Sequence, residues 1–368
     1  VGWSYWVTWV SYVPSEMIAA GIIMNTFLPE VGTIWWAVLF GLLVTFLNLF
    51  RVDKFGESEF WLALVKIIAL VAFSVVALLI CLGLIGDEGY IGTDILLGSG
   101  GFAPHGYASV ALTMVIILVN FQGTEIIGLA AGETADPARS IPTAVRNVTW
   151  RIIALYIIPI TLLVSILPWD HASLSKSVFA AALAEHGLAH LGALFSFVVL
   201  TAALSCSNSG LYGAARTVHA LATMGMAPCA LGGLSHKGVP SRAIYASIAF
   251  CWGVIALYAL RPDAALYTYL LALSGFSGAV AWISICWSQY RRRRRLEAAG
   301  TVSLLRYRMP LFPYVTLFGI WAQVLCLLFM AFTPELRSAL YLGVPMLVVP
   351  MLLYRFLRRR RAHDIIEK

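Results

Sequence analysis

The chain has 368 residues, of which 60% are hydrophobic and 12% are charged. Soluble domains contain only about 45–50% apolar residues, so this composition predicts an integral membrane protein and excludes a large soluble domain. The net charge of +7 does not indicate nucleic-acid binding, because the basic residues are spread over the connections between apolar segments rather than gathered on one soluble face.

The sequence offers no constellation for enzyme chemistry or for a bound metal. The six cysteines contain no C-x-x-C pair, and His186 and His190 are the only histidines with the i, i+4 spacing of metal ligands. Zinc requires three or four protein ligands, and this pair has no obvious third partner. There is also no H-E-x-x-H motif, no phosphate-binding glycine loop and no nucleophile beside a base. We therefore expect no catalytic residue, metal or cofactor.

Ten apolar segments are candidate transmembrane helices, since a bilayer core about 30 Å thick needs about 20 residues of helix. They cover residues 3–24, 34–50, 60–84, 107–131, 152–167, 188–214, 244–260, 266–289, 312–332 and 340–357. The predicted fold is an all-α, multi-pass membrane protein with about ten transmembrane helices.

The distribution of basic residues predicts which side of the membrane each connection occupies. Alternate connections place 21 of the 25 Lys and Arg residues on one side and three on the other, with Lys66 inside a segment. Cytoplasmic connections carry the excess of Lys and Arg, so the first side is predicted to be cytoplasmic. It includes the loops predicted at 132–151, 214–242 and 290–311, and the C-terminus.

The first apolar segment carries polar residues on one face. Trp9, Tyr12 and Glu16 follow an i, i+3, i+7 spacing, which places them on the same side of a helix. Carboxylates inside a membrane usually serve ion or substrate pathways, so we expect Tyr12 and Glu16 to face such a path. The alternative is that Glu16 only pairs with a neighbouring helix.

The third segment opens with Glu57 and Glu59, which are predicted to cap a helix N-terminus at the cytoplasmic surface. Lys66 lies about two turns further along. Its stem either carries the ammonium back to the surface or presents a fixed or titrating charge to the interior, where it suits proton exchange. The sequence leaves both interpretations open.

The fourth segment contains the most informative run, Asn120-Phe-Gln-Gly-Thr-Glu125, near its centre. An ionisable residue at the bilayer midplane costs about 2.5–3.5 kcal/mol on insertion scales, and such residues are usually functional. If the helix opens near Gly123, one half ends in free carbonyls that attract a cation and the other begins with free amides that attract an anion. The alternative is a continuous helix in which Asn120, Gln122 and Glu125 bond to neighbouring helices.

Two later features combine turn signals with polar residues. Asp136 followed by Pro137 predicts an N-cap and a short cytoplasmic helix. The sixth segment contains Ser205-Cys-Ser-Asn-Ser-Gly210, whose small residues either permit close helix packing or provide polar groups for a cation path. Beyond it, residues 216–234 are predicted to form an amphipathic cytoplasmic segment.

The chain contains a series of motifs whose order along the sequence is distinctive. They are Phe121-Gln-Gly-Thr-Glu125, Ala131-Gly-Glu-Thr-Ala-Asp-Pro137, Ser140-Ile-Pro142, Ser205-Cys-Ser-Asn-Ser209 with Tyr212 and Arg216, and Gly225-Met-Ala-Pro228. Together they resemble the bacterial amino acid permeases of the amino acid, polyamine and organocation (APC) superfamily, over essentially the whole chain. Within that family the chain looks most similar to the lysine, S-methylmethionine and 4-aminobutyrate permeases.

The resemblance implies an APC-type inverted-repeat transporter fold of twelve helices, with the first and sixth unwound at the substrate site. On this pattern residues 1–368 are a permease transmembrane domain that starts at the third helix, on the cytoplasmic side, and 107–131 is the sixth helix. The first two helices are then expected to be missing, together with the glycine-rich break that binds the substrate carboxylate.

The resemblance also implies roles for individual residues. Carbonyls near Asn120 and Phe121 are expected to bind the substrate ammonium, Phe121 is a plausible gate, and Lys66 matches a fifth-helix lysine that takes the place of a sodium ion in proton-coupled relatives. The predicted substrate-binding residues are Tyr12, Glu16, Asn120, Phe121, Gly123, Thr124 and Glu125. The predicted ion- or proton-coupling residues are Lys66, Ser205, Asn208 and Glu125.

The resulting hypothesis is a secondary active transporter that imports an amino acid across the bacterial cytoplasmic (inner) membrane by proton symport and alternating access. Glu16 and Glu125 would balance a cationic or zwitterionic substrate, which favours cationic or ω-amino substrates. The expected partners are the amino acid, protons and the lipid bilayer. The alternative is a non-transporting membrane amino acid sensor or assembly subunit that docks a partner on residues 291–368.

Overall fold

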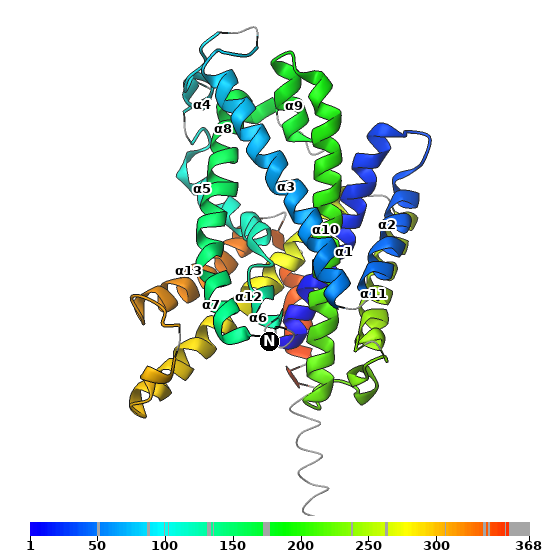
Figure 1. The fold of residues 1–368 in the computed structure, drawn as a ribbon, viewed down its shortest axis with the longest axis vertical. Coiled ribbons are helices and arrows are strands. Elements are labelled where there is room, and N and C mark those ends of the chain that lie inside the picture. Colours follow the sequence, from blue (N-terminus) through cyan, green and yellow to red (C-terminus); the bar gives the residue numbers. More distant parts are fainter. Residues whose placement is uncertain are drawn as a thin grey trace, which may run out of the picture. The chain divides into compact units, whose positions relative to one another are not determined.

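The computed structural model describes residues 1–352, apart from 50–51, 87–88, 99, 102, 131–133, 135, 172–176, 237, 262–263, 306, 334–335, 338 and 350. Expectations for the end of the segment at 340–357 and for the basic C-terminus lie outside the described residues. All regular elements within the described ranges are helices (Figure 1).

The helices follow one another with short connections. They are α1 (Gly2–Phe27), α2 (Thr33–Asn48), α3 (Val52–Cys81), α4 (Asp94–Gly98), α5 (Gly106–Ile117), α6 (Ile126–Ala130), α7 (Pro137–Ile152), α8 (Ile158–Ile166), α9 (Val178–Glu185), α10 (Ala189–Thr223), α11 (Ser241–Leu260), α12 (Ala264–Ala298) and α13 (Tyr314–Phe332). A 3-10 turn, Leu118–Phe121, follows α5, and a π-helical turn, Ile153–Ile157, joins α7 to α8. A further apolar helix, Ala339–Val349, follows α13.

Seven helices in the described part of the chain are long and apolar enough to cross a membrane. They are Gly2–Phe27, Glu59–Cys81, Pro137–Ile166, Ala189–Thr223, Ser241–Leu260, Leu266–Ala298 and Tyr314–Phe332. The other three predicted segments correspond to the 16-residue α2, to the interrupted pair α5 and α6, and to Ala339–Val349. The prediction of an all-α, multi-pass membrane protein is confirmed.

Several helices run on through stretches that the sequence predicted as loops. α7 and α8 form one run from Pro137 to Ile166, α10 extends to Thr223, and α12 extends through Arg291–Arg295 to Ala298. Hydropathy marks where a helix leaves the apolar layer, not where its hydrogen bonding stops. α12 stops just before Gly300, whose φ of +66° is the left-handed conformation typical of a helix C-terminus.

The N-terminus of α7 has the cap that the sequence predicts. The Asp136 side chain accepts a hydrogen bond from Arg139 N at 3.3 Å, and Pro137 occupies the first helical position. The expected short helix is wrong in its length, because the π-helical turn carries the backbone directly into α8. No glycine interrupts this run.

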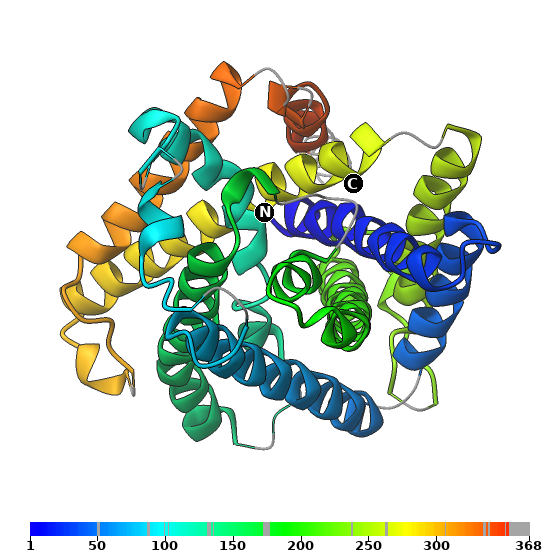
Figure 2. The same ribbon diagram turned by 90° about the horizontal axis from the view of Figure 1, so that it is seen from above.

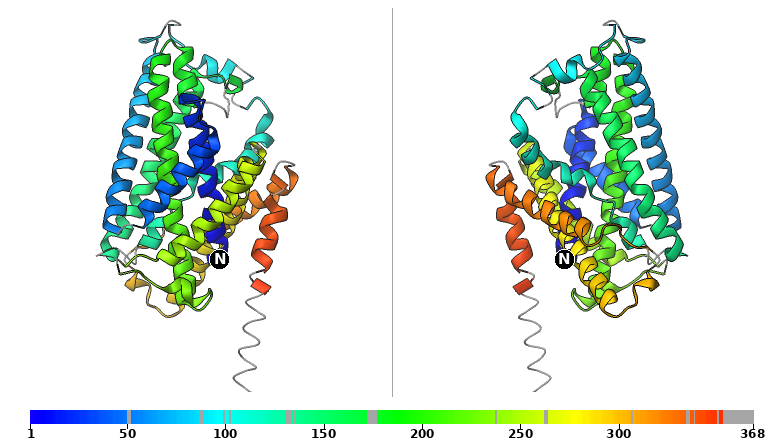
Figure 3. Two further views of the ribbon diagram at one scale, coloured as in Figure 1. Left: turned by 90° about the vertical axis from the view of Figure 1, so that its right-hand side faces the viewer. Right: turned by 90° about the vertical axis from the view of Figure 1, so that its left-hand side faces the viewer.

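Contacts divide the chain into two compact units, which we describe separately. The first contains residues 1–15, 111–129 and 210–368, and within it α12 packs against α13 (Figure 3). The second contains residues 16–110 and 130–209, and within it α3 packs against α8 (Figure 2). Phe73, Ile166, Leu183 and Phe195 belong to a buried hydrophobic cluster in the second unit.

Candidate functional site

The predicted break in the fourth apolar segment is present. α5 ends at Ile117, the 3-10 turn Leu118–Phe121 follows, and residues 122–125 form non-helical turns before α6 begins. Figure 1 shows α5 and α6 as separate teal helices. Gly123 has a φ of +104°, a conformation that residues with a Cβ rarely adopt. The hypothesis of a continuous helix is therefore wrong.

The Glu125 carboxylate lies at this break and accepts hydrogen bonds from three neutral groups. Tyr5 Oη on α1 donates to Oε1 at 2.9 Å, and Trp282 Nε1 on α12 donates to Oε2 at 3.1 Å. The Gly123 backbone N–H points at both oxygens, 3.2 Å from each. Among the described residues, each of these partners is a hydrogen-bond donor, and none of them carries a positive charge.

Gln122 ties the same turn to two helices of the first unit. Its Nε2 donates to Ser274 O on α12 at 3.0 Å, and the Ser274 hydroxyl lies 3.0 Å from Gln122 Oε1 and 2.9 Å from Thr8 O on α1. Side chains on both sides of Gly123 are thus held by hydrogen bonds. These hydrogen bonds fix the position of the irregular backbone at residues 122–125.

The other predicted residues of the run lie at the same break. Asn120 and Thr124 are exposed, and Phe121 is half-buried. Thr124 Oγ1 donates to the Phe121 carbonyl at 3.3 Å. Their roles in binding stay predictions.

The aromatic face of α1 is present, but the sequence did not predict its key member, Tyr5. Tyr5 precedes Trp9 by one turn, and the two rings meet edge to face, as do those of Trp9 and Tyr12. Trp9 is 3% exposed because Gly210 and Gly213 of α10 leave room for its ring. Tyr5 follows the same helical spacing and was recognisable from it.

Glu16 was predicted as a site residue, whereas Trp282 contacts Glu125 without having been predicted. Glu16 is a half-buried residue of α1 within the second unit, and its predicted role stays a prediction. Trp282 was not predicted, because a tryptophan in an apolar segment carries no signal of its own. Only the packing of α12 brings its indole to Glu125.

The predicted coupling residues Lys66, Ser205 and Asn208 lie together in the second unit. Lys66 Nζ on α3 donates to Ser205 Oγ on α10 at 2.8 Å, and Ser205 Oγ donates to Glu59 Oε2 at 2.7 Å. Asn208 Nδ2 donates to Glu59 Oε1 at 2.6 Å. A hydrogen-bonded chain therefore joins the half-buried ammonium to a carboxylate through a buried hydroxyl.

The assignment of Glu59 as a helix cap is wrong. α3 begins at Val52, so Glu59 lies in the interior of the helix, and it is i, i+7 from Lys66 on the same face. Glu57, by contrast, is exposed. The sequence placed the helix start too late, because it used the first apolar residue as the boundary.

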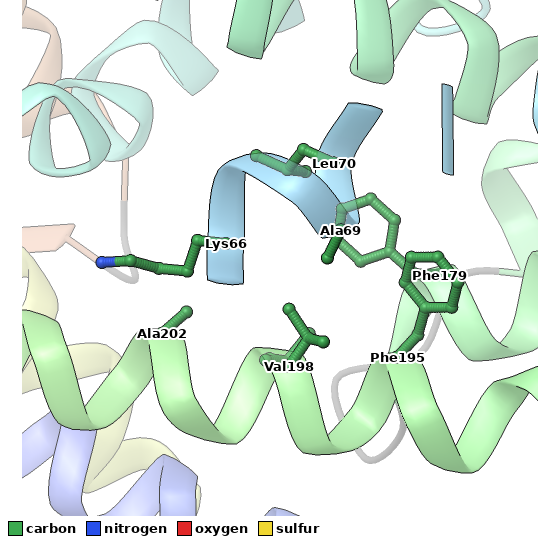
Figure 4. A pocket seen from close by; sticks show the side chains of 8 residues that line it. Lys66, Ala69, Leu70, Phe179, Phe195, Val198 and Ala202 are labelled. Atoms are coloured by element: carbon green, nitrogen blue, oxygen red, sulfur yellow. The ribbon is translucent and has the colours of Figure 1, made fainter. Parts of the chain in front are cut away.

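A small apolar cavity of about 110 Å³ lies beside Lys66 within the second unit. Its walls include Ala69, Val198, Phe179 and Phe195. Figure 4 shows the Lys66 stem near this space with its nitrogen pointing away from the two phenylalanines. Because the wall of this cavity is apolar, the Lys66 ammonium bonds to the polar side chain of Ser205 instead.

Secondary transporters bind substrates at helices that are interrupted within the membrane, where free backbone groups and a few charged side chains meet. An interrupted helix with a carboxylate at the break is the arrangement found in that class. The amino acid permease family model matches residues 1–367. The chain belongs to the amino acid permease family of the APC superfamily, and it is an amino acid transporter rather than an enzyme.

Individual relatives agree with this assignment. The chain is 36% identical to the amino-acid permease RocC of Bacillus subtilis (strain 168), with 100% of this chain and 79% of the relative covered. It is 34% identical to the gamma-aminobutyric acid permease of the same organism, with coverage of 99% and 77%. It is also 34% identical to the lysine-specific permease LysP of Escherichia coli (strain K12), with coverage of 97% and 76%.

Proposed function

We propose that the protein imports an amino acid together with a proton by alternating access, with Glu125 at the substrate path. The observation that carries this proposal is that Glu125 lies at the helix break, where its three hydrogen-bond donors among the described residues are all neutral. Glu125 is half-buried, and a carboxylate partly withdrawn from water is stabilised by a counter-charge, which a substrate ammonium would supply on arrival. The carbonyls near Asn120 and Phe121 would bind the same group.

The same charge argument concerns the class of substrate. A cationic amino acid carries a second positive group besides its α-amino group, and an ω-amino acid carries its positive group in place of an α-amino group. Either group can compensate a carboxylate. Relatives at 34% identity are named for lysine and for gamma-aminobutyric acid, which carry such groups. We propose substrates of this kind, with Tyr12, Glu16 and Thr124 also facing the path.

Proton coupling is assigned to Lys66 and its partners. Lys66 bonds to Ser205, which is 2% exposed, and Asn208 is fully buried beside them. The Lys66–Ser205 hydrogen bond joins α3 to α10, so a movement of one helix against the other would change what the ammonium contacts. Coupling a proton to a conformational change requires such a link.

The orientation in the membrane is proposed from charge and exposure. The bias of Lys and Arg supports a cytoplasmic connection after α12 and a cytoplasmic C-terminus, and we propose the bacterial inner membrane as the location. α13 exposes Phe318, Trp321, Leu325 and Phe332, each more than half exposed, which suits contact with lipid.

We expect the protein encoded by the full gene, reconstituted in liposomes, to accumulate labelled lysine, arginine or 4-aminobutyrate when the outside is acidic. Excess unlabelled substrate inside should also drive counterflow, and a pH dye inside should report proton entry upon substrate addition. Leucine serves as the matched neutral control. Binding of these amino acids without counterflow would contradict the proposal and favour the sensor or assembly subunit.

A further inference from the structure

We propose that Glu59 is the internal proton acceptor for Lys66, reached through the Ser205 hydroxyl. The inference rests on the proposed proton symport and adds a residue to it. Lys66 and Glu59, the two ends of the hydrogen-bonded chain, lie on α3, and the relay residue Ser205 lies on α10. All three belong to the second unit. Both hydrogen bonds, 2.8 Å and 2.7 Å, are short enough for proton transfer.

The neighbouring amides determine which oxygen of Glu59 receives the proton. Asn48 Nδ2 on α2 donates to Asn208 Oδ1 at 2.8 Å, so the Asn208 amide nitrogen must face Glu59. That nitrogen lies 2.6 Å from Oε1 and can only donate to it. Oε1 is therefore held as an acceptor, and Oε2, opposite the Ser205 hydroxyl, is the oxygen free to take a proton.

The arrangement also fixes the direction of the relay. Lys66 has only N–H donors when charged, so Ser205 Oγ accepts from it and turns its own proton towards Glu59. In the transfer, the Lys66 proton passes to Ser205 Oγ as the Ser205 proton passes to Glu59 Oε2. One N–H and one O–H bond break, two O–H bonds form, and the ion pair becomes a neutral amine and a neutral carboxyl.

The groups that bridge the two half-buried ends, Lys66 and Glu59, are shielded from solvent. Asn208, Asn48 and Ser205 are each at most 2% exposed, and the cavity beside Lys66 is apolar. An isolated charge is costly there, whereas the charged pair and the neutral pair both keep the site neutral overall. Among the described residues of the second unit, the other titratable groups on these helices are Glu57 and Cys81 on α3, His190 and Cys206 on α10, and Tyr156 on the π-helical turn.

The test separates proton coupling from substrate exchange in liposomes containing the full protein and labelled lysine or 4-aminobutyrate. Glu59→Gln keeps the size and hydrogen bonding of the side chain but cannot accept the proton. We expect substrate-driven proton entry and gradient-driven uptake to fall by about tenfold or more, the scale of losing one charged partner. Counterflow, which needs no net proton movement, should change much less. The matched control is Glu57→Gln, on the same helix and exposed, which should behave like the unaltered protein.

Ser205→Ala provides the second variant, because it removes the relay and leaves both charged ends. It should show the same split between coupled uptake and counterflow, and Glu59→Asp should recover part of the coupling. Normal substrate-linked proton entry in Glu59→Gln or in Ser205→Ala would overturn the inference. An equal fall of both activities in both variants would also overturn it, because it would indicate a purely structural contact. Absence of proton entry in the unaltered protein would instead overturn proton symport itself, and the acceptor role with it.

Discussion

We expect Glu125→Gln to lower uptake of the transported amino acid by about tenfold to a hundredfold, the scale of a hydrogen bond to a charged group. The carboxylate is bonded by Tyr5, Trp282 and Gly123, and glutamine has the same shape. Its amide nitrogen can donate to the Tyr5 hydroxyl, which rotates to accept, while its oxygen still accepts from Trp282. The loss should therefore come from charge and not from misfolding.

Two companion variants identify the cause of that loss. Tyr5→Phe removes one donor but keeps the negative charge, so it should cost less uptake than Glu125→Gln. Thermal unfolding in detergent should give a similar midpoint for Glu125→Gln and the unaltered protein. Unchanged uptake and apparent affinity in Glu125→Gln would remove Glu125 from the substrate path.

Gly123→Ala should destabilise the protein by about 1–3 kcal/mol, the cost of forcing a residue with a Cβ into a sparsely populated backbone conformation. The φ of Gly123 is +104°, and a Cβ built there meets only Trp9, at an ordinary 3.9 Å. The penalty therefore comes from the backbone dihedral and not from a clash. Relief of this strain would move the Gly123 N–H away from Glu125. We expect a lower unfolding temperature together with reduced uptake.

Gly128→Ala is the matched control for that substitution. Gly128 lies in α6, only five residues further on, with no atom near the position of a Cβ. Alanine there favours the helix, so stability and uptake should be equal to or above those of the unaltered protein. Equal effects of the two substitutions would show that the dihedral at Gly123 is not what holds the break in place.

Features caused by residues close together in the sequence were predicted more accurately than features that depend on distant residues. The all-α fold, the apolar segments and the break near Gly123 follow from residues close together in the chain. The Asp136–Pro137 cap was predictable for the same reason. The helix ends were predicted less well, because α3 begins before its apolar part and α12 continues beyond its own.

The partners of the charged groups depended on contacts between distant residues. Tyr5 and Glu125 are 120 residues apart, and Glu59 and Ser205 are 146 apart. Lys66 illustrates the limit, since the sequence could not choose between an ammonium at the surface and one in the interior. The hydrogen bond to Ser205 shows which group the ammonium meets.

The sequence alone thus determined that this chain crosses the membrane repeatedly, and it predicted a helix break at the glycine beside Glu125, with a continuous helix as the alternative. Hydropathy and the backbone preferences of glycine and proline act over a few consecutive residues, so their effects can be read directly from the sequence. Only the tertiary structure decided that Glu125 has neutral donors and that Glu59, rather than capping a helix, accepts from Ser205 and Asn208. Which side chains meet depends on how helices pack, and packing brings together residues that no local pattern connects.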